Sequence, residues 1–105
     1  MIVYNVTVIV EPSIHAEWLD WMKEVHLPEV LATGRFNNCN MFKINPQNTD
    51  EDPTYSIQYQ AESIEKFEEY VANEADELKK KAADRYGEKM LAYRTILEHV
   101  VTLVP

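Results

Sequence analysis

The sequence predicts an α+β fold built in the order strand, helix, strand, strand, helix, strand. Four segments are rich in β-branched and aromatic residues, and two others repeat apolar residues every three or four positions, as an amphipathic helix does. With 105 residues, 46% of them hydrophobic, the chain has the size of one packed domain spanning residues 1–105.

The first strand is predicted over residues 2–10, IVYNVTVIV, because β-branched and aromatic residues favour an extended backbone. Polar Asn5 and Thr7 share one face. The larger apolar residues share the other face: Tyr4, Val6 and Val8.

The first helix is predicted to begin at Ile14, because Pro12 stops the strand and Ser13 suits the N-cap position. Pro28 limits its regular course, and Thr33-Gly34 ends a short continuation. Its apolar residues gather on one side of a helical wheel: Ile14, Trp18, Trp21, Met22 and Val25.

Two strands are predicted in the middle of the chain, joined by the polar connection PQNTDEDP. The first runs from Phe36 to Asn45, with Phe36, Phe42 and Ile44 on one face and Cys39 and Met41 on the other. The second covers residues 54–61 and alternates regularly: Tyr55, Ile57 and Tyr59 on one face, Ser56, Gln58 and Gln60 on the other.

The second helix is predicted to be long, from an N-cap at Ser63 to a stop at Gly87. Its early turns are acidic and its later turns carry Lys79, Lys80 and Lys81, which suits the helix dipole and indicates a solvated face. Its apolar stripe has six members: Ile64, Phe67, Val71, Ala75, Leu78 and Ala82.

The last strand is predicted over residues 91–104, LAYRTILEHVVTLV. Its fourteen extended residues would span roughly 46 Å, which is longer than an average strand. We therefore expect this strand to project toward a partner.

This order of elements is that of the ferredoxin-like fold, in which a four-stranded antiparallel sheet carries both helices on one face. The opposite face is predicted to mix apolar residues with Asn5, Gln58, Arg94 and Glu98. Such a face suits a second copy of the chain. We expect Asn5, Gln58 and Arg94 to pair across that dimer, including an Arg94–Glu98 contact.

Charge and composition exclude several classes of partner. The formal net charge of −8 argues against nucleic acid and anionic membrane surfaces. The single cysteine, Cys39, excludes an intrachain disulfide. With only two glycines the chain has no Gly-rich phosphate loop, and we expect no cofactor. No apolar stretch is long enough to span a bilayer and no basic leader begins the sequence, so we expect a cytoplasmic protein.

The whole chain resembles the dimeric αβ-barrel group of ferredoxin-like proteins, and within it a small uncharacterised bacterial family. The resemblance rests on the order of elements, the Trp-rich first helix and the segment HLPEVLATG at residues 26–34. It implies a homodimer whose two sheets pack face to face, with a pocket between each sheet and its first-helix region. Several members carry a similar His-x-Pro bordering that pocket, matched by His26 and Pro28. The group includes cofactor-independent monooxygenases, isomerases and haem-handling enzymes, so the resemblance leaves the activity open.

His26 is the candidate catalytic residue, because imidazole titrates near neutral pH and can act as acid, base or hydrogen-bond donor. Glu24 and Glu29 lie near enough in sequence to bias its protonation. The structural alternative is that a histidine in the last turn of a helix interacts with the terminal carbonyls.

The candidate ligand-binding residues also have structural alternatives, packing for the aromatic ones and pairing across the dimer for the polar ones. Cys39 is expected to be a buried or half-buried thiol. No metal site is expected, because His15 and His26 are eleven residues apart, roughly 16 Å along a helix. The candidates are Asn5, Trp18, Trp21, Gln58, Tyr59 and Arg94.

The sequence therefore predicts a homodimer that binds a small organic, partly aromatic or apolar, molecule near His26. If the protein is an enzyme, the residues suit proton transfer or cofactor-free oxidation, with His26 as acid or base and Gln58 or Asn5 fixing a polar atom. The alternative is a noncatalytic dimeric binding or interaction module whose barrel interior is filled by its own side chains.

Overall fold

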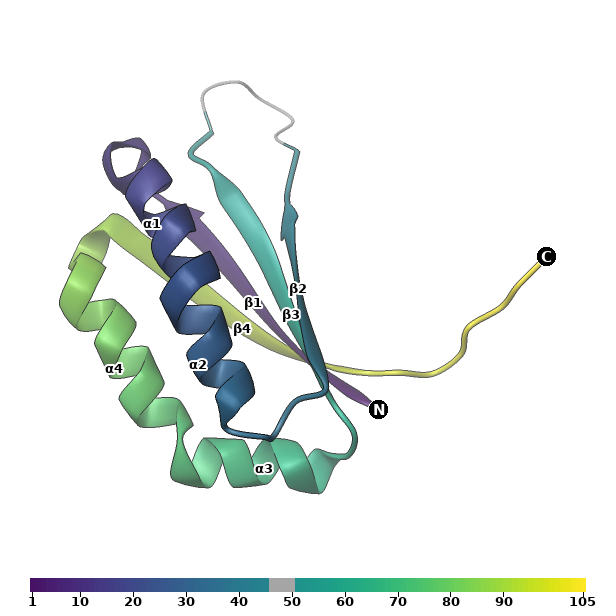
Figure 1. Cartoon of the computed structure of the whole chain (residues 1–105). Helices are drawn as coiled ribbons and strands as arrows, with labels where there is room; N and C mark the ends of the chain where they lie inside the picture. Colours follow the sequence, from purple (N-terminus) through teal and green to yellow (C-terminus); the bar gives the residue numbers. More distant parts are fainter. Residues whose placement is uncertain (46–50) are drawn as a thin grey trace.

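A four-stranded antiparallel sheet forms one layer, and the helices cover one of its faces (Figure 1). The structure is a computed structural model that describes residues 1–45 and 51–105. The strands are β1 (Ile2–Val10), β2 (Asn38–Lys43), β3 (Thr54–Ala61) and β4 (Met90–Glu98), in the order β2-β3-β1-β4. This confirms the predicted α+β, ferredoxin-like fold. Most of the predicted connection between β2 and β3, residues 46–50, lies outside the described residues.

The central strand β1 sets the two faces of the sheet. Its even-numbered residues from Ile2 to Val10 are buried under the helices, whereas its odd-numbered residues are only half-buried. In β3, Tyr55, Ile57 and Tyr59 pair with buried β1 residues and are themselves buried. The alternation predicted for these two strands is therefore confirmed.

The first α-helix begins at His15, one residue later than predicted. A 3₁₀ turn over Pro12–Ile14 precedes α1 (His15–Trp21), and no side chain caps either segment. The prediction of Ser13 as N-cap was wrong, because Ser13 lies inside the 3₁₀ turn.

A π-helical turn over Met22–His26 joins α1 to α2 (Leu27–Ala32). Pro28 explains this turn, because in an α-helix its missing N–H would face the Glu24 carbonyl and its ring would clash with it. The Leu27 N–H instead reaches back five residues to the Met22 carbonyl. His26 therefore lies inside a continuous helical run, and its expected position in a last turn was wrong.

The wider π turn also changes which residues face the sheet. Val25, expected in the core, is 39% exposed, whereas Val30 in α2 is buried. A period of 3.6 residues does not hold across a π turn, which explains why the wheel misplaced Val25.

Strand β2 is shorter than predicted, and its odd-numbered side chains Cys39 and Met41 face the core. Phe36 is buried in the segment before the strand, and the Asn37 N–H donates to the Gln60 carbonyl at 2.7 Å. Phe42 is 53% exposed, while Cys39 and Met41 pack against the core. The expected grouping of Phe36 with Phe42 and Ile44 was therefore wrong.

The predicted second helix is two helices, α3 (Ile64–Asn73) and α4 (Ala75–Tyr86), which meet at Glu74 (Figure 1). Arg35, from the segment before β2, holds the Glu74 carboxylate at 3.0 Å and also contacts Glu69. The Ser63 cap and the stop at Gly87 are confirmed, since the Ser63 side chain accepts from the Lys66 N–H and Gly87 has a φ of 55°.

The change of direction at Glu74 moves part of the predicted apolar stripe out of the core. Ile64 and Val71 are exposed, so their predicted burial was wrong, and Tyr70 is buried instead. In α4, Leu78 and Ala82 are buried as predicted.

Strand β4 ends at Glu98, six residues before the predicted end. One backbone bond extends the ladder, from the His99 N–H to the Met1 carbonyl at 3.1 Å, and beyond it no strand remains for pairing within the described residues. Residues 99–105 continue away from the sheet as an extended segment (Figure 1). This segment is apolar yet uncovered, with Val100 89% exposed.

Within residues 1–45 and 51–105, none of the helices combines the length and the apolar character that crossing a membrane requires.

Candidate functional site

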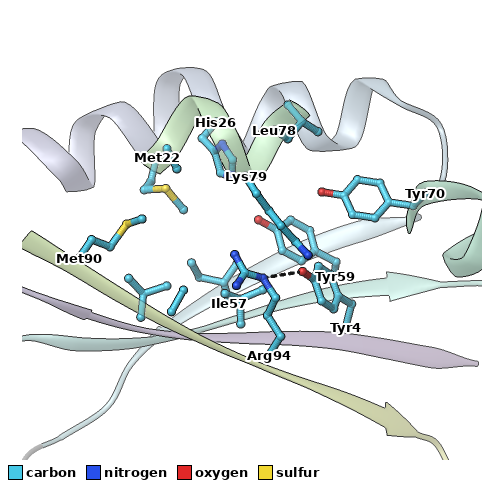
Figure 2. A pocket seen from close by; sticks show the side chains of 14 residues that line it. Tyr4, Met22, His26, Ile57, Tyr59, Tyr70, Leu78, Lys79, Met90 and Arg94 are labelled. Atoms are coloured by element: carbon cyan, nitrogen blue, oxygen red, sulfur yellow. Dashed lines mark hydrogen bonds between the residues drawn. The ribbon is translucent and has the colours of Figure 1, made fainter. Parts of the chain in front are cut away.

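A cavity of about 50 Å³ lies between the sheet and the helices (Figure 2). Strands β1, β3 and β4 supply its floor, while the π turn, α3 and α4 supply its roof. Its apolar lining is Val6, Val8, Met22, Ile57, Leu78, Ala82, Met90 and Ala92. Its polar lining is Tyr4, His26, Tyr59, Tyr70, Lys79 and Arg94.

Arg94 reaches this cavity because of the strand register. It pairs with buried Val6, so its side chain shares the helix-covered face of the sheet. Ile96 and Glu98 share that face too, since they pair with Tyr4 and Ile2. The prediction that Arg94, Ile96 and Glu98 occupy the opposite face was wrong.

Arg94 is held by a tyrosine. Its Nε donates to the Tyr4 hydroxyl at 3.1 Å, the contact drawn in Figure 2. Burial raises the pKa of Tyr4, which the nearby positive charge of Arg94 only partly offsets. Tyr4 therefore remains a neutral phenol near pH 7, and its own O–H is free to donate.

His26 enters the cavity wall from the π turn. Its ring stacks on Trp21, with centroids 5.0 Å apart and planes 23° from parallel. Burial lowers the pKa of His26 below its ordinary value of 6.5, and the positive charges of Lys81 and Arg94 add to this, while Glu29 opposes it. The imidazole is therefore neutral near pH 7 and can accept a proton or donate one hydrogen bond.

Two more phenols complete the polar lining. Burial raises the pKa of Tyr59 and of Tyr70 well above the ordinary value of 10.0. Both therefore keep their protons, and a neutral hydroxyl can donate to a ligand oxygen. The cavity thus combines neutral donors with the two cations Lys79 and Arg94.

Three of the seven predicted site residues lie together at this cavity: His26, Tyr59 and Arg94. Trp18 is fully buried in the core, where its Nε1 donates to the Met90 sulfur at 3.2 Å. Trp21 does not line the cavity, but its ring stacks on the ring of His26, which does.

Asn5 and Gln58 lie on the opposite face of the sheet from the cavity, where they pair with each other in the register. Ser56 links them, because its hydroxyl donates to Asn5 Oδ1 at 2.6 Å and accepts from Gln58 Nε2 at 3.3 Å. Asn5 Oδ1 and Gln58 Nε2 are therefore both bonded within a single chain.

Sequence reasoning missed Tyr4, Tyr70 and Lys79 as cavity residues. Lys79 was interpreted as part of a solvated basic run, although it follows buried Leu78 directly and lies three residues before buried Ala82. That spacing places Lys79 at the margin of the core-facing stripe of the helix. The spacing could therefore have indicated from the sequence that Lys79 reaches the cavity.

Within the described part of the chain, neither the single cysteine nor a cluster of metal-binding side chains adds a reactive group to the cavity. Cys39 is half-buried, and burial raises the pKa of its thiol to about 11, so little thiolate exists near neutral pH. In residues 1–45 and 51–105, no three His, Cys, Asp or Glu side chains converge as a metal centre requires.

Solved structures share this architecture at low sequence identity. An ethyl tert-butyl ether (EthD) family protein from Bacillus halodurans is 15% identical and superposes with a TM-score of 0.68, covering 95% of this chain and 100% of that one. A Deinococcus radiodurans protein named for antibiotic biosynthesis monooxygenases is 10% identical, with a TM-score of 0.63 over 100% and 98% of the two chains. A dimeric ferredoxin-like protein from an uncultured marine organism is 12% identical, with a TM-score of 0.62 over 97% and 96%. These similarities concern the fold alone.

Among curated proteins, none matches this chain significantly. A family model does match, over residues 1–100 of the 105, and its description is "Domain of unknown function (DUF4286)". The chain belongs to the DUF4286 family.

Proposed function

We propose that this protein is a homodimeric αβ-barrel that binds a small, partly apolar organic molecule in the cavity between sheet and helices. The observation that carries this proposal is the make-up of the lining, where apolar walls surround a few convergent polar groups. Ligand sites have this composition, whereas an ordinary core contains no cluster of cations and histidine.

Cavity size limits the ligand. Drug-sized molecules occupy sites of roughly 300–1,000 Å³, and one water needs about 10–15 Å³ of space for its centre. A cavity of about 50 Å³ therefore suits a ligand of a few non-hydrogen atoms, or one end of a longer molecule.

His26 supplies the chemistry of the proposed site. A neutral imidazole can take a proton from a bound ligand, and Arg94 and the phenols can stabilise the negative charge that this transfer creates. The proposed reaction class is therefore proton transfer, or an oxidation of the ligand anion in which dioxygen takes up the electrons without a cofactor, with His26 as the base.

The open face of the sheet supports the proposed dimer. Its residues are the odd-numbered ones of β1 and β4 and the even-numbered ones of β2 and β3, from Val3, Asn38, Thr54 and Leu91 onward. None of these residues is charged, although 27% of the chain is. Depletion of charge is typical of the centre of a protein interface.

The second candidate function is the noncatalytic dimer, which the small cavity volume favours. In that case the side chains of the open sheet faces fill the barrel interior, and Arg94 with Tyr4 serves stability alone. The two candidates differ in whether a small molecule reaches His26.

Nuclear magnetic resonance distinguishes them with a fragment library and tag-free protein. We expect hits that shift His26 and the cavity methyl groups together, and that lose affinity in His26→Gln but not in His99→Gln, whose parent residue is exposed. A library that leaves these signals unchanged would exclude the binding proposal and leave the noncatalytic dimer. Native mass spectrometry of the same sample checks the dimer, and a monomer would contradict the barrel.

A further inference from the structure

We infer that the ligand of this cavity carries a carboxylate, held between Arg94 of β4 and Lys79 of α4. The inference rests on the proposed function, since it names the chemical class of the molecule bound at the same cavity.

The first argument is charge pairing. Within residues 1–45 and 51–105, the lysines and arginines that form ion pairs are Arg35, Lys80, Lys81 and Arg85. Arg94 and Lys79 form none, although both line the cavity. Arg94 is exposed and Lys79 is half-buried, so both cations stand at the solvent-accessible side of the cavity. Two neighbouring cations without a counter-ion attract an anion to that place.

The second argument is the absence of acidic groups from the lining. The chain has 18 Asp and Glu residues against 10 Lys and Arg, yet no Asp or Glu is among the residues that line the cavity. Glu29 acts on His26 and Glu74 acts on Tyr70 from outside the lining. Within the lining itself, the charges of Lys79 and Arg94 have no acidic neighbour, and such a local excess of positive charge attracts a negative ligand.

The third argument is the direction of the donors. Only Nε of Arg94 is used by Tyr4, so the two terminal nitrogens remain available for a bidentate contact with a carboxylate. Lys79 descends from α4 on the other side of the space, toward Tyr59 and Arg94 (Figure 2). The Tyr4 hydroxyl accepts from Arg94, and so its own proton can be donated to the same anion.

The apolar lining indicates what the carboxylate is attached to. Met22 and Met90 lie together at the end of the cavity away from Tyr70 (Figure 2). An alkyl or small ring group would contact these flexible side chains while the carboxylate faces the cations. The ligand class is therefore a short-chain or small-ring monocarboxylate.

The test compares propionate with propionamide, which has the same shape and no charge. Each is titrated into the wild-type protein and followed by nuclear magnetic resonance at His26 and the Met22 and Met90 methyl groups. We expect propionate to bind at least about tenfold more tightly, because hydrogen bonds to charged groups are the stronger ones. We expect Lys79→Gln and Arg94→Gln each to remove most of that preference.

Lys80→Gln is the matched control, since Lys80 is the next residue of α4, is exposed and does not line the cavity. It should leave propionate binding unchanged. Arg94→Lys keeps the positive charge but cannot make a bidentate contact with a carboxylate. This variant replaces Arg94→Gln in the titration if Arg94→Gln does not fold.

Equal binding of propionate and propionamide at the cavity would overturn the carboxylate inference and leave the proposed small-molecule function intact. Failure of both probes, together with failure of the wider fragment library, would overturn both. A preference for propionate that survives both Lys79→Gln and Arg94→Gln would also contradict the assignment of these two residues, as would an unchanged propionate affinity in Arg94→Lys.

Discussion

His26 shows how a single side chain acquires a defined charge state from its surroundings. Trp21 stacks against one side of the ring, and the helices and sheet exclude water from much of the rest. Burial disfavours the imidazolium form, and Lys81 and Arg94 disfavour it further, so that the attraction of Glu29 is outweighed. The residue is therefore suited to act as a base rather than as a fixed cation.

The replacement His26→Gln tests this charge state through stability. Because the pKa of His26 is lower in the folded than in the unfolded state, the unfolded chain binds more protons below pH 6.5. The contribution of His26 to stability is therefore full above pH 6.5 and is lost as the pH falls toward the lower folded value. Urea unfolding between pH 7.5 and 5 should show a smaller loss of unfolding free energy for His26→Gln than for wild type, with His99→Gln matching wild type. Parallel pH profiles for all three would contradict the depressed pKa.

The hydrogen bond between Arg94 and Tyr4 gives a second prediction for single residues. Tyr4→Phe keeps the buried ring but removes the acceptor of Arg94 Nε, so we expect a loss of about 1 kcal/mol of unfolding free energy. Tyr93→Phe is the control, because it keeps the ring on the open face and removes a hydroxyl that forms no side-chain hydrogen bond with the described residues, so it should cost less than about 0.5 kcal/mol. Chemical denaturation measures both, and equal costs would show that the contact contributes nothing specific.

Among the elements, the helices depart from the sequence prediction more than the strands do. The break between α3 and α4 occurs where Arg35, distant in sequence, binds Glu74 and Glu69. The π turn occurs where Pro28 interrupts the α-helical bonding. Pro28 is visible in the sequence, but the wider turn that accommodates it is not, and the Arg35 contact depends on tertiary packing. Both features position the site, since His26 and Lys79 lie on these two helical runs.

A pair of truncations tests the break between α3 and α4. Leu78→Ala should cost about 2–5 kcal/mol of unfolding free energy, because Leu78 is buried under the sheet. Val71→Ala, at a position that a continuous helix would bury, should cost less than about 1 kcal/mol, because Val71 is 48% exposed. Similar costs in thermal or urea unfolding would indicate that α3 faces the core as a straight helix would.

At the scale of the whole molecule, the fold was predicted correctly mainly because polar and apolar residues alternate along the strands. β1 and β3 have clear polar and apolar faces, so their burial followed directly from the sequence. In β4 both faces carry apolar residues, so parity alone did not decide the side of Arg94, and the register with β1 decides it. The cavity joins residues of β1, α3 and α4, which are distant in sequence, so Tyr4 and Tyr70 were not found from local patterns. Lys79 was missed although its spacing from Leu78 and Ala82 was a local signal.

The size of the uncharged sheet face bears on the proposed dimer. The four strands have nine, six, eight and nine residues, and at about 3.3 Å per residue and about 4.8 Å between strands they give a face of roughly 500 Å². A stable interface buries about 800 Å² on each partner. The exposed apolar segment 99–105 extends beyond the sheet and would supply the additional contact area on a second copy.

Tyr93→Glu tests this assembly, because Tyr93 lies in the row of the open face that also contains Thr7, Ser56 and Phe42. A carboxylate buried there without a partner, and present twice in a symmetric dimer, should weaken association by about 100-fold or more. Val71→Glu places the same charge on the exposed side of α3, away from that face, and should leave the association unchanged. Sedimentation velocity over a concentration series measures both variants. If Tyr93→Glu dimerises as tightly as wild type, then the two copies meet through a surface other than the open sheet face. Residues 99–105 would then contact the second copy at that other surface.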